Sequence, residues 1–194
     1  WLFRITINMT ELSGVSWVRK FPGSNMTNTL QYTFRKKVED FISTLNKSGA
    51  KVVISATFRP PERAYLMHWS WMIMNYKADY TKIPAMKNVD IDWDHKDKMK
   101  SINAARVMGN AFGISNLRVP PALQSRHTDG LAIDMDISWS GDLSILDKDG
   151  KLVKISTFPR DGMNKELQNV AKSFGVIKIV VGQKDKPHWS SDGH

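Results

Sequence analysis

Residues Ser125 to Asp134 read SRHTDGLAID and place a histidine, a glycine and two aspartates at the start of an apolar run. Residues 131–139, LAIDMDISW, alternate apolar and polar side chains with the two-residue period of a strand. His127 and Asp134 are seven residues apart, which on a continuous strand sends their side chains to opposite faces. On a continuous helix the same spacing separates them by roughly 10 Å along the axis. Because Gly130 permits a bend, we predict a loop, a glycine bend and a strand that bring His127 beside Asp134.

The sequence on both sides of this stretch mixes helical and strand patterns. In chain order we expect a helix within 29–50, a strand at 51–58, helices at about 64–78 and 96–112, the strand at 131–139, a hairpin at 145–155, a helix within 163–175 and a strand at 176–182. This order favours an α+β fold, an antiparallel sheet with flanking helices, over a regular series of βαβ units.

The chain of 194 residues is long enough to bury a substantial core. Its 41% hydrophobic and 24% charged residues are typical of a folded, water-soluble protein, so we expect no membrane-spanning segment. No linker divides the sequence, which predicts a single domain over 1–194 with a helical insertion at about 64–118. The first residue is Trp1 rather than Met, which indicates a processed or trimmed N-terminus.

The charge balance points to an anionic partner. Lys and Arg number 28 against 19 Asp and Glu, a formal net charge of +9. Nucleic acid, an anionic membrane surface and an acidic cell-wall polymer would all attract such a chain. Because no long basic run and no nucleic-acid-binding motif is present, we expect a broadly basic surface and no nucleic-acid partner.

The absence of cysteine restricts any metal site to histidine and carboxylate ligands. Beside His127 and Asp134, the histidine in the most suggestive surroundings is His188, in the segment DKPHW. Two imidazoles and one carboxylate leave a fourth position open for water, which is typical of a catalytic zinc site. We therefore predict one Zn²⁺ per chain, held by these three residues, that activates a water molecule for amide hydrolysis.

Hydrolysis also requires a proton acceptor and a group that stabilises the developing negative charge. Asp185 lies three residues before His188 in a proline-containing turn and is the candidate general base. Arg59 lies at a junction between a strand and a helix, where consecutive prolines follow it, and is the candidate oxyanion stabiliser.

Three motifs in this order resemble a known family of enzymes. Ser125 to Asp134 has the form S-x-H-x-x-G-x-A-x-D, an acidic residue and His188-Trp189 follow downstream, and ISATFRPPERA lies upstream at 54–64. Together they resemble peptidase family M15, the zinc D,D-carboxypeptidases and L-alanyl-D-glutamate endopeptidases that cut peptidoglycan stem peptides. The resemblance implies a hedgehog/D,D-peptidase-like α+β fold and a periplasmic or extracellular location at the cell wall. By the same resemblance His127, Asp134 and His188 would bind zinc, Asp185 would be the general base, Arg59 would be catalytic and bind substrate, and Ser125 and Trp189 would contact substrate.

The acidic residue bears on which bond is cut. Many family members have glutamate at the position of Asp185, whereas aspartate occurs in phage-type endopeptidases, so we expect an endopeptidase acting on an L-alanyl-D-glutamate or similar bond. The alternatives are a D-alanyl-D-alanine carboxypeptidase or dipeptidase, and a catalytically inactive module that binds the cell wall.

Two further histidines lie beside tryptophans. His68 and His95 are best interpreted as partly buried helix residues with hydrogen-bonded rings, and the alternative is a second metal or an extension of the substrate groove. No clear counterpart of the segment that contains them is expected in small members of the family.

Overall fold

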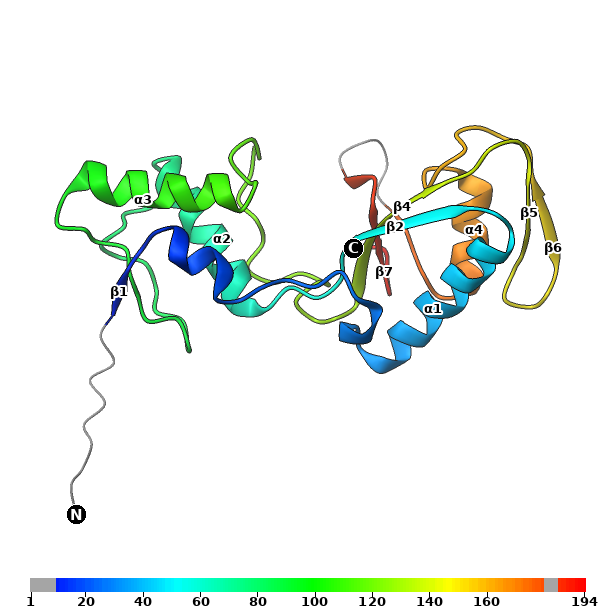
Figure 1. Cartoon of the computed structure of the whole chain (residues 1–194), viewed down its shortest axis with the longest axis horizontal. Coiled ribbons are helices and arrows are strands. Elements are labelled where there is room, and N and C mark those ends of the chain that lie inside the picture. Colours follow the sequence, from blue (N-terminus) through cyan, green and yellow to red (C-terminus); the bar gives the residue numbers. More distant parts are fainter. Residues whose placement is uncertain (1–9, 180–184) are drawn as a thin grey trace, which may run out of the picture. The chain divides into compact units, whose positions relative to one another are not determined.

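The chain passes three times between two units, the second of which carries the stretch from Ser125 to Asp134. Unit 1 comprises Trp1–Pro22 and Pro60–Leu123, and unit 2 comprises Gly23–Arg59 and Gln124–His194. The computed structural model describes residues 10–179 and 185–194 (Figure 1). The insertion predicted at about 64–118 falls inside the second segment of unit 1.

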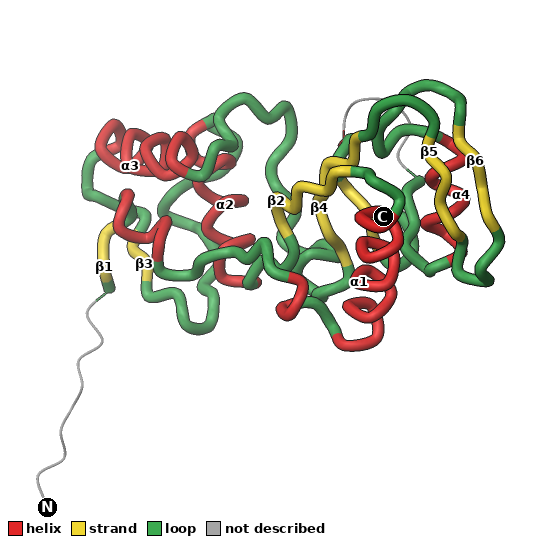
Figure 2. The backbone as a smooth tube through the Cα atoms, turned by 45° about the vertical axis from the view of Figure 1, so that its right-hand side comes forward, coloured by secondary structure: helices red, strands yellow, loops and turns green. Residues whose placement is uncertain are grey.

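Unit 2 is built on a three-stranded antiparallel sheet with β4 in the middle. The strand order is β2 (Lys51–Ala56), β4 (Ala132–Ser138) and β7 (His188–Ser190). A separate hairpin pairs β5 (Leu143–Leu146) with β6 (Leu152–Ile155), as Figure 2 shows. The central position of β4 places Asp134 between residues of both neighbouring strands.

Two helices share the core of unit 2 with this sheet. They are α1 (Tyr32–Lys47) and α4 (Lys165–Ser173), which Figure 1 shows beside the strands. Along β4 the alternation predicted from the sequence is present, since Ile133, Met135 and Ile137 are buried while the intervening residues are more exposed. The same core contains Leu30, Phe34, Val38, Phe41, Leu45, Leu143, Ile145, Ile155, Leu167, Val170, Phe174, Val176 and Trp189.

Unit 1 is mainly helical. Helices α2 (Pro61–Met74) and α3 (Lys98–Ala111) pack against each other and against the 3-10 helix η1 (Val15–Arg19). Short strands β1 (Glu11–Leu12) and β3 (Ile91–Asp92) pair in parallel. The aromatic and methionine residues of α2 are buried or partly buried, which assigns them to packing. The core of the unit includes Trp17, Tyr65, Leu66, Ile73, Val89, Trp93, Ile102, Ala105 and Met108.

The predicted α+β class is confirmed, with small shifts in the boundaries of its elements. Helix α2 begins at Pro61 rather than Ala64, because proline is pre-organised for the first helical position. Helix α3 begins at Lys98, where the side chain of Asp97 accepts a hydrogen bond from the Lys100 amide. The strand predicted at 176–182 is not formed by its described residues 176–179, of which Ile177 forms an isolated bridge to Ser190; residues 180–182 lie outside the described part.

The sequence predicts no membrane-spanning segment. In the part of the chain that the structure describes, no helix combines the length and the apolar character needed to cross a bilayer.

Candidate metal centre

Strand pairing positions two of the three predicted ligands. Asp134 of β4 and His188 of β7 lie directly opposite each other in the antiparallel ladder. Opposed residues project from the same face of a sheet, and this face is opposite to the one on which Ile133 is buried in the core. As a result Asp134 Oδ1 lies 3.1 Å from His188 Nδ1.

The turn before β4 supplies the third side chain. Gly130 has a φ of +70°, and a Cβ atom there would lie 3.1 Å from the Gln31 backbone nitrogen. Gln31 N–H donates to the Gly130 carbonyl, and Arg59 N–H donates to the His127 carbonyl at 3.1 Å. The predicted glycine bend is therefore present, and it is held by segments that precede and follow β2.

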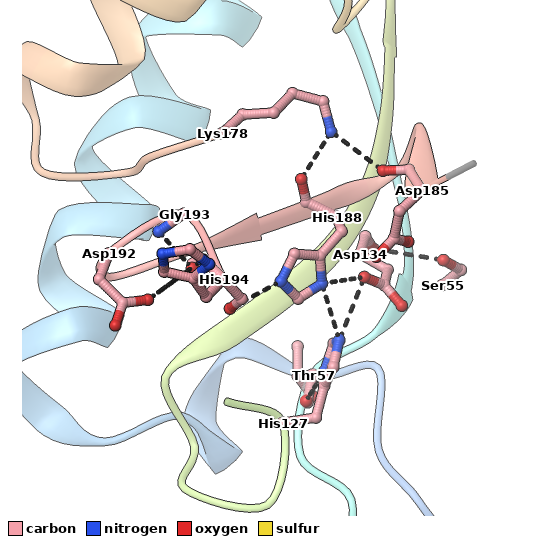
Figure 3. Close-up of polar contacts among 11 residues, drawn as sticks. Ser55, Thr57, His127, Asp134, Lys178, Asp185, His188, Asp192, Gly193 and His194 are labelled. Atoms are coloured by element: carbon pink, nitrogen blue, oxygen red, sulfur yellow. Dashed lines mark hydrogen bonds and ion pairs between the residues drawn. The ribbon is translucent and has the colours of Figure 1, made fainter. Parts of the chain in front are cut away.

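The bend brings three ligand atoms together, as Figure 3 shows. His127 Nε2 lies 3.2 Å from Asp134 Oδ1 and 3.2 Å from His188 Nδ1. Ligands held about 2.0 to 2.1 Å from a tetrahedral ion lie roughly 3.3 to 3.4 Å from one another. The spacing of these atoms therefore fits a small tetrahedral cation, and His127, Asp134 and His188 form a group that can hold a metal ion.

In each of the two imidazole rings, the nitrogen that points away from the candidate metal position forms a hydrogen bond with a backbone oxygen, and these bonds explain why a cation is needed. His127 Nδ1 donates to the Thr57 carbonyl at 2.6 Å, and His188 Nε2 donates to the His194 carbonyl at 3.2 Å. In a neutral ring the second nitrogen then presents a lone pair. Two lone pairs and a carboxylate oxygen consequently face one another, an arrangement of three acceptors that requires a positive charge between them.

The pKa values of Asp134 and His188 show the same need for positive charge, because both shifts arise when a ring nitrogen carries a proton that it donates to the carboxylate. Burial acts to raise the pKa of Asp134, but hydrogen bonds with His127 and His188 outweigh it and hold that pKa well below its usual range. Burial acts to lower the pKa of His188, and the hydrogen bond with Asp134 outweighs it, so that this pKa is raised. Asp134 is thus ionised at neutral pH, and a proton on His188 is the cation that competes with a metal.

The three ligand atoms open onto a cavity of about 750 Å³. The described residues that line it all belong to unit 2: Arg59, Gln124, Ser125, Arg126, His127, Asp129, Asp134, Asp185, His188 and His194. Burial lowers the pKa of Arg59, while Asp134 and Asp185 raise it; arginine nevertheless stays charged in proteins. Among residues 10–179 and 185–194 the Arg59 guanidinium has no hydrogen-bond or ion-pair partner, so its donors are available to a bound group.

Asp185 and Ser125 reach the same cavity from two different segments. Asp185 is exposed and immediately precedes the turn into β7. The Ser125 hydroxyl oxygen is buried and has no hydrogen-bond partner among the described residues. The cavity therefore combines a carboxylate, a guanidinium and a hydroxyl with the three candidate ligands.

Trp189 is not brought to the cavity. It is 0% exposed and packs in the core against Phe41, with ring centroids 6.0 Å apart. Since successive strand residues point to opposite faces, His188 on the site side places Trp189 on the core side. The predicted substrate contact of Trp189 is corrected by this position, and its role is in packing.

Several residues at the site were not identified from the sequence. The Thr57 and His194 carbonyls orient the two imidazoles, and backbone acceptors leave no signature in a sequence. Arg126 lines the cavity and pairs with Asp192 and Asp129. Lys178, within the apolar run VIKIVVG, did offer a signal, because a lysine that is buried with an apolar segment must find acceptors.

Comparison with known proteins finds no family model that matches the chain and no matching curated relative.

Proposed function

We propose that this chain is a zinc-dependent peptidase that hydrolyses amide bonds in the stem peptides of peptidoglycan. The observation that supports it best is the convergence of His127, Asp134 and His188 on one point beside a cavity that also contains an aspartate and an arginine with no partner among the described residues. A structural metal site would be closed by a fourth protein ligand. Three ligands next to an open cavity favour catalysis.

Zinc is the metal we propose, one ion per chain. Two imidazole nitrogens and one carboxylate oxygen form a borderline ligand set that suits Zn²⁺, whereas Mg²⁺ and Ca²⁺ prefer oxygen ligands alone. When bound, zinc supplies a Lewis acid that lowers the pKa of a water molecule toward neutrality and polarises a carbonyl.

The residues of the chain supply the remaining steps. Asp185 accepts a proton from the attacking water and later delivers it to the leaving amine, as a general base and then a general acid. Arg59 donates hydrogen bonds to the carbonyl oxygen as it gains negative charge. The Ser125 hydroxyl, which lacks a partner among the described residues, orients the peptide.

The substrate class is proposed from sequence motifs and charge. The three motifs resemble peptidase family M15, and a hedgehog/D,D-peptidase-like arrangement of unit 2 is part of the proposal. Aspartate rather than glutamate at Asp185 favours an endopeptidase that cuts an L-alanyl-D-glutamate or similar bond. The net charge of +9 favours association with an acidic wall polymer in the periplasm or outside the cell.

One observation favours a second candidate, a D-alanyl-D-alanine carboxypeptidase. The arginine of the cavity has no hydrogen-bond or ion-pair partner among the residues that the structure describes, and such a group is suited to a terminal carboxylate, which it binds through two parallel hydrogen bonds. Mass spectrometry of digested muropeptides separates the candidates, because a carboxypeptidase removes only the terminal D-alanine and an endopeptidase splits the stem internally.

The test is digestion of purified peptidoglycan by the full chain with and without a chelator. We expect defined stem-peptide fragments that disappear on chelation and return with zinc. Asp185→Ala should keep zinc and lose cleavage by about 100-fold or more, whereas Asp149→Ala, in the exposed β5–β6 turn, is the matched control. Full cleavage by Asp185→Ala would remove the general base from the proposal, and zinc-dependent retention on peptidoglycan without fragments would indicate a binding module.

A further inference from the structure

Lys178 is a buried lysine whose ammonium group lies beside the candidate metal centre (Figure 3). Its Nζ donates to the His188 carbonyl at 2.6 Å and to the Asp185 carbonyl at 3.3 Å. The same Nζ lies 5.0 Å from the centroid of the Trp189 ring. One ammonium group therefore contacts both ends of the segment Asp185–His188.

A lysine in this position is costly to the fold. Moving an ammonium group out of water is unfavourable unless it is paired and hydrogen-bonded. Burial lowers the pKa of Lys178, and nearby carboxylates, first Asp185 and then Asp134, oppose that shift. An apolar side chain would pack against Trp189 without this cost, which indicates that the ammonium group serves something other than stability.

The two ends of the segment differ in how they are otherwise held. His188 is paired with Asp134 in the β-ladder, and the carbonyl of the preceding Pro187 accepts from the Met135 amide at 2.8 Å. Asp185 precedes β7 and lacks such ladder bonds in the described part of the chain, where its carbonyl has Lys178 as its partner. Loss of the ammonium group should therefore displace Asp185 far more than His188.

We propose that Lys178 is a positioning residue that ties the Asp185 backbone to that of His188 and so holds the Asp185 carboxylate at the metal centre. The inference rests on the proposed function, because only that function gives Asp185 a role as general base for which it must be positioned. It predicts that catalysis depends on Lys178 while metal binding does not.

The decisive variant is Lys178→Met, which keeps the length of the side chain and removes the charge and the donors. We expect kcat for a soluble muropeptide to fall about 10- to 100-fold, the size of effects from residues that orient a site. KM and zinc affinity should stay within about threefold, since His188 remains held by β4. Lys172→Met, on the exposed surface of α4, is the matched control and should match the native enzyme.

Two further variants separate positioning from stability. Lys178→Arg keeps the charge and the donors and should recover most of the lost kcat. Lys178→Gln keeps a neutral hydrogen-bond donor on a shorter side chain. If Lys178→Met does not fold, kcat of Lys178→Gln tests the positioning role instead. A folded Lys178→Met or Lys178→Gln protein with native kcat overturns the inference, and so does loss of folding in both.

The proposed function fails separately from this inference. If the native chain releases no fragments from peptidoglycan with zinc present, the function is wrong whatever Lys178 does. If the native chain is active and Lys178→Met is equally active, only the role of Lys178 is wrong.

Discussion

Two histidines of unit 1 and two of unit 2 form side-chain hydrogen bonds that differ in where the remaining ring nitrogens point. In unit 1, His68 donates from Nδ1 to the Pro121 carbonyl at 2.8 Å, and His95 Nε2 lies 3.0 Å from the Ser13 hydroxyl. In unit 2, His127 and His188 also donate outward, but their remaining nitrogens meet at 3.2 Å beside Asp134. Hydrogen bonding of a buried ring is thus common to both units, and convergence of lone pairs is confined to one.

This difference separates a packing histidine from a ligand. A single buried histidine ring that forms a hydrogen bond needs no additional ion to compensate for its burial. Two rings that direct acceptors at the same carboxylate leave a deficit of positive charge that only a proton or a metal ion can fill. Within the described residues, the group in unit 2 is the one set of three side chains with this property. The alternative of a second metal at His68 and His95 therefore gains no support.

The largest expected effect is loss of zinc from Asp134→Ala. Removing the carboxylate leaves two neutral rings in a buried place, so zinc affinity should fall about 1000-fold or more, which corresponds to about 4 kcal/mol. Competition with a chromophoric chelator measures this directly. Asp136→Ala, two residues along β4 and exposed, is the control. Native zinc affinity in Asp134→Ala would show that convergence at Asp134 does not define the site.

Removal of the metal should lower the stability of unit 2 and leave that of unit 1 unchanged. Zinc at 100 times its dissociation constant stabilises the protein that binds it by about 2.7 kcal/mol. Hydrogen exchange with and without chelator should therefore show faster exchange in β4 and β7 after chelation, while α2 and α3 of unit 1 are unchanged. Equal acceleration in both units would contradict the assignment of the metal to unit 2.

The parts of the site that the sequence predicts are those governed by local geometry. The alternation along β4 and the left-handed bend at Gly130 depend on neighbouring residues, so a short stretch specifies them. Strand alternation also predicts on which face of the sheet Trp189 lies, because a His188 side chain that faces the site requires the next side chain to face the core. Applied to both residues, the same rule would have predicted that packing role.

The parts that sequence did not predict depend on segments distant in the chain. The carbonyl that orients His127 comes from Thr57, 70 residues away. A carbonyl is present at every residue, so only the folded chain shows which one accepts. The division of the chain into two compact units likewise depends on tertiary structure and not on a local sequence pattern.

Glycine substitutions compare the bend of unit 2 with a turn of unit 1. Gly130 and Gly113 both have φ near +70°, but a Cβ at Gly130 meets the Gln31 backbone at 3.1 Å, whereas at Gly113 nothing lies within 4 Å. Gly113→Ala should cost about 1 kcal/mol of unfolding free energy from backbone conformation alone. Gly130→Ala should cost about 2 kcal/mol or more and weaken zinc binding, because His127 shifts with the turn. Denaturant unfolding and zinc titration measure both; equal stabilities and equal zinc affinities would mean that the bend is not tied to the site.

The smallest effect is expected in unit 1, from His95→Ala. The ring bonds the hydroxyl and the carbonyl of Ser13, a residue that is 4% exposed, so its removal leaves a buried serine with fewer partners. A loss of about 1 kcal/mol in unfolding free energy follows, and zinc affinity should equal that of the native chain. A fall in zinc affinity in this variant would break the distinction between the two pairs of histidines. It would mean that a ring with satisfied hydrogen bonds in unit 1 still contributes to the metal centre, so that convergence of lone pairs would no longer be enough to identify the ligands.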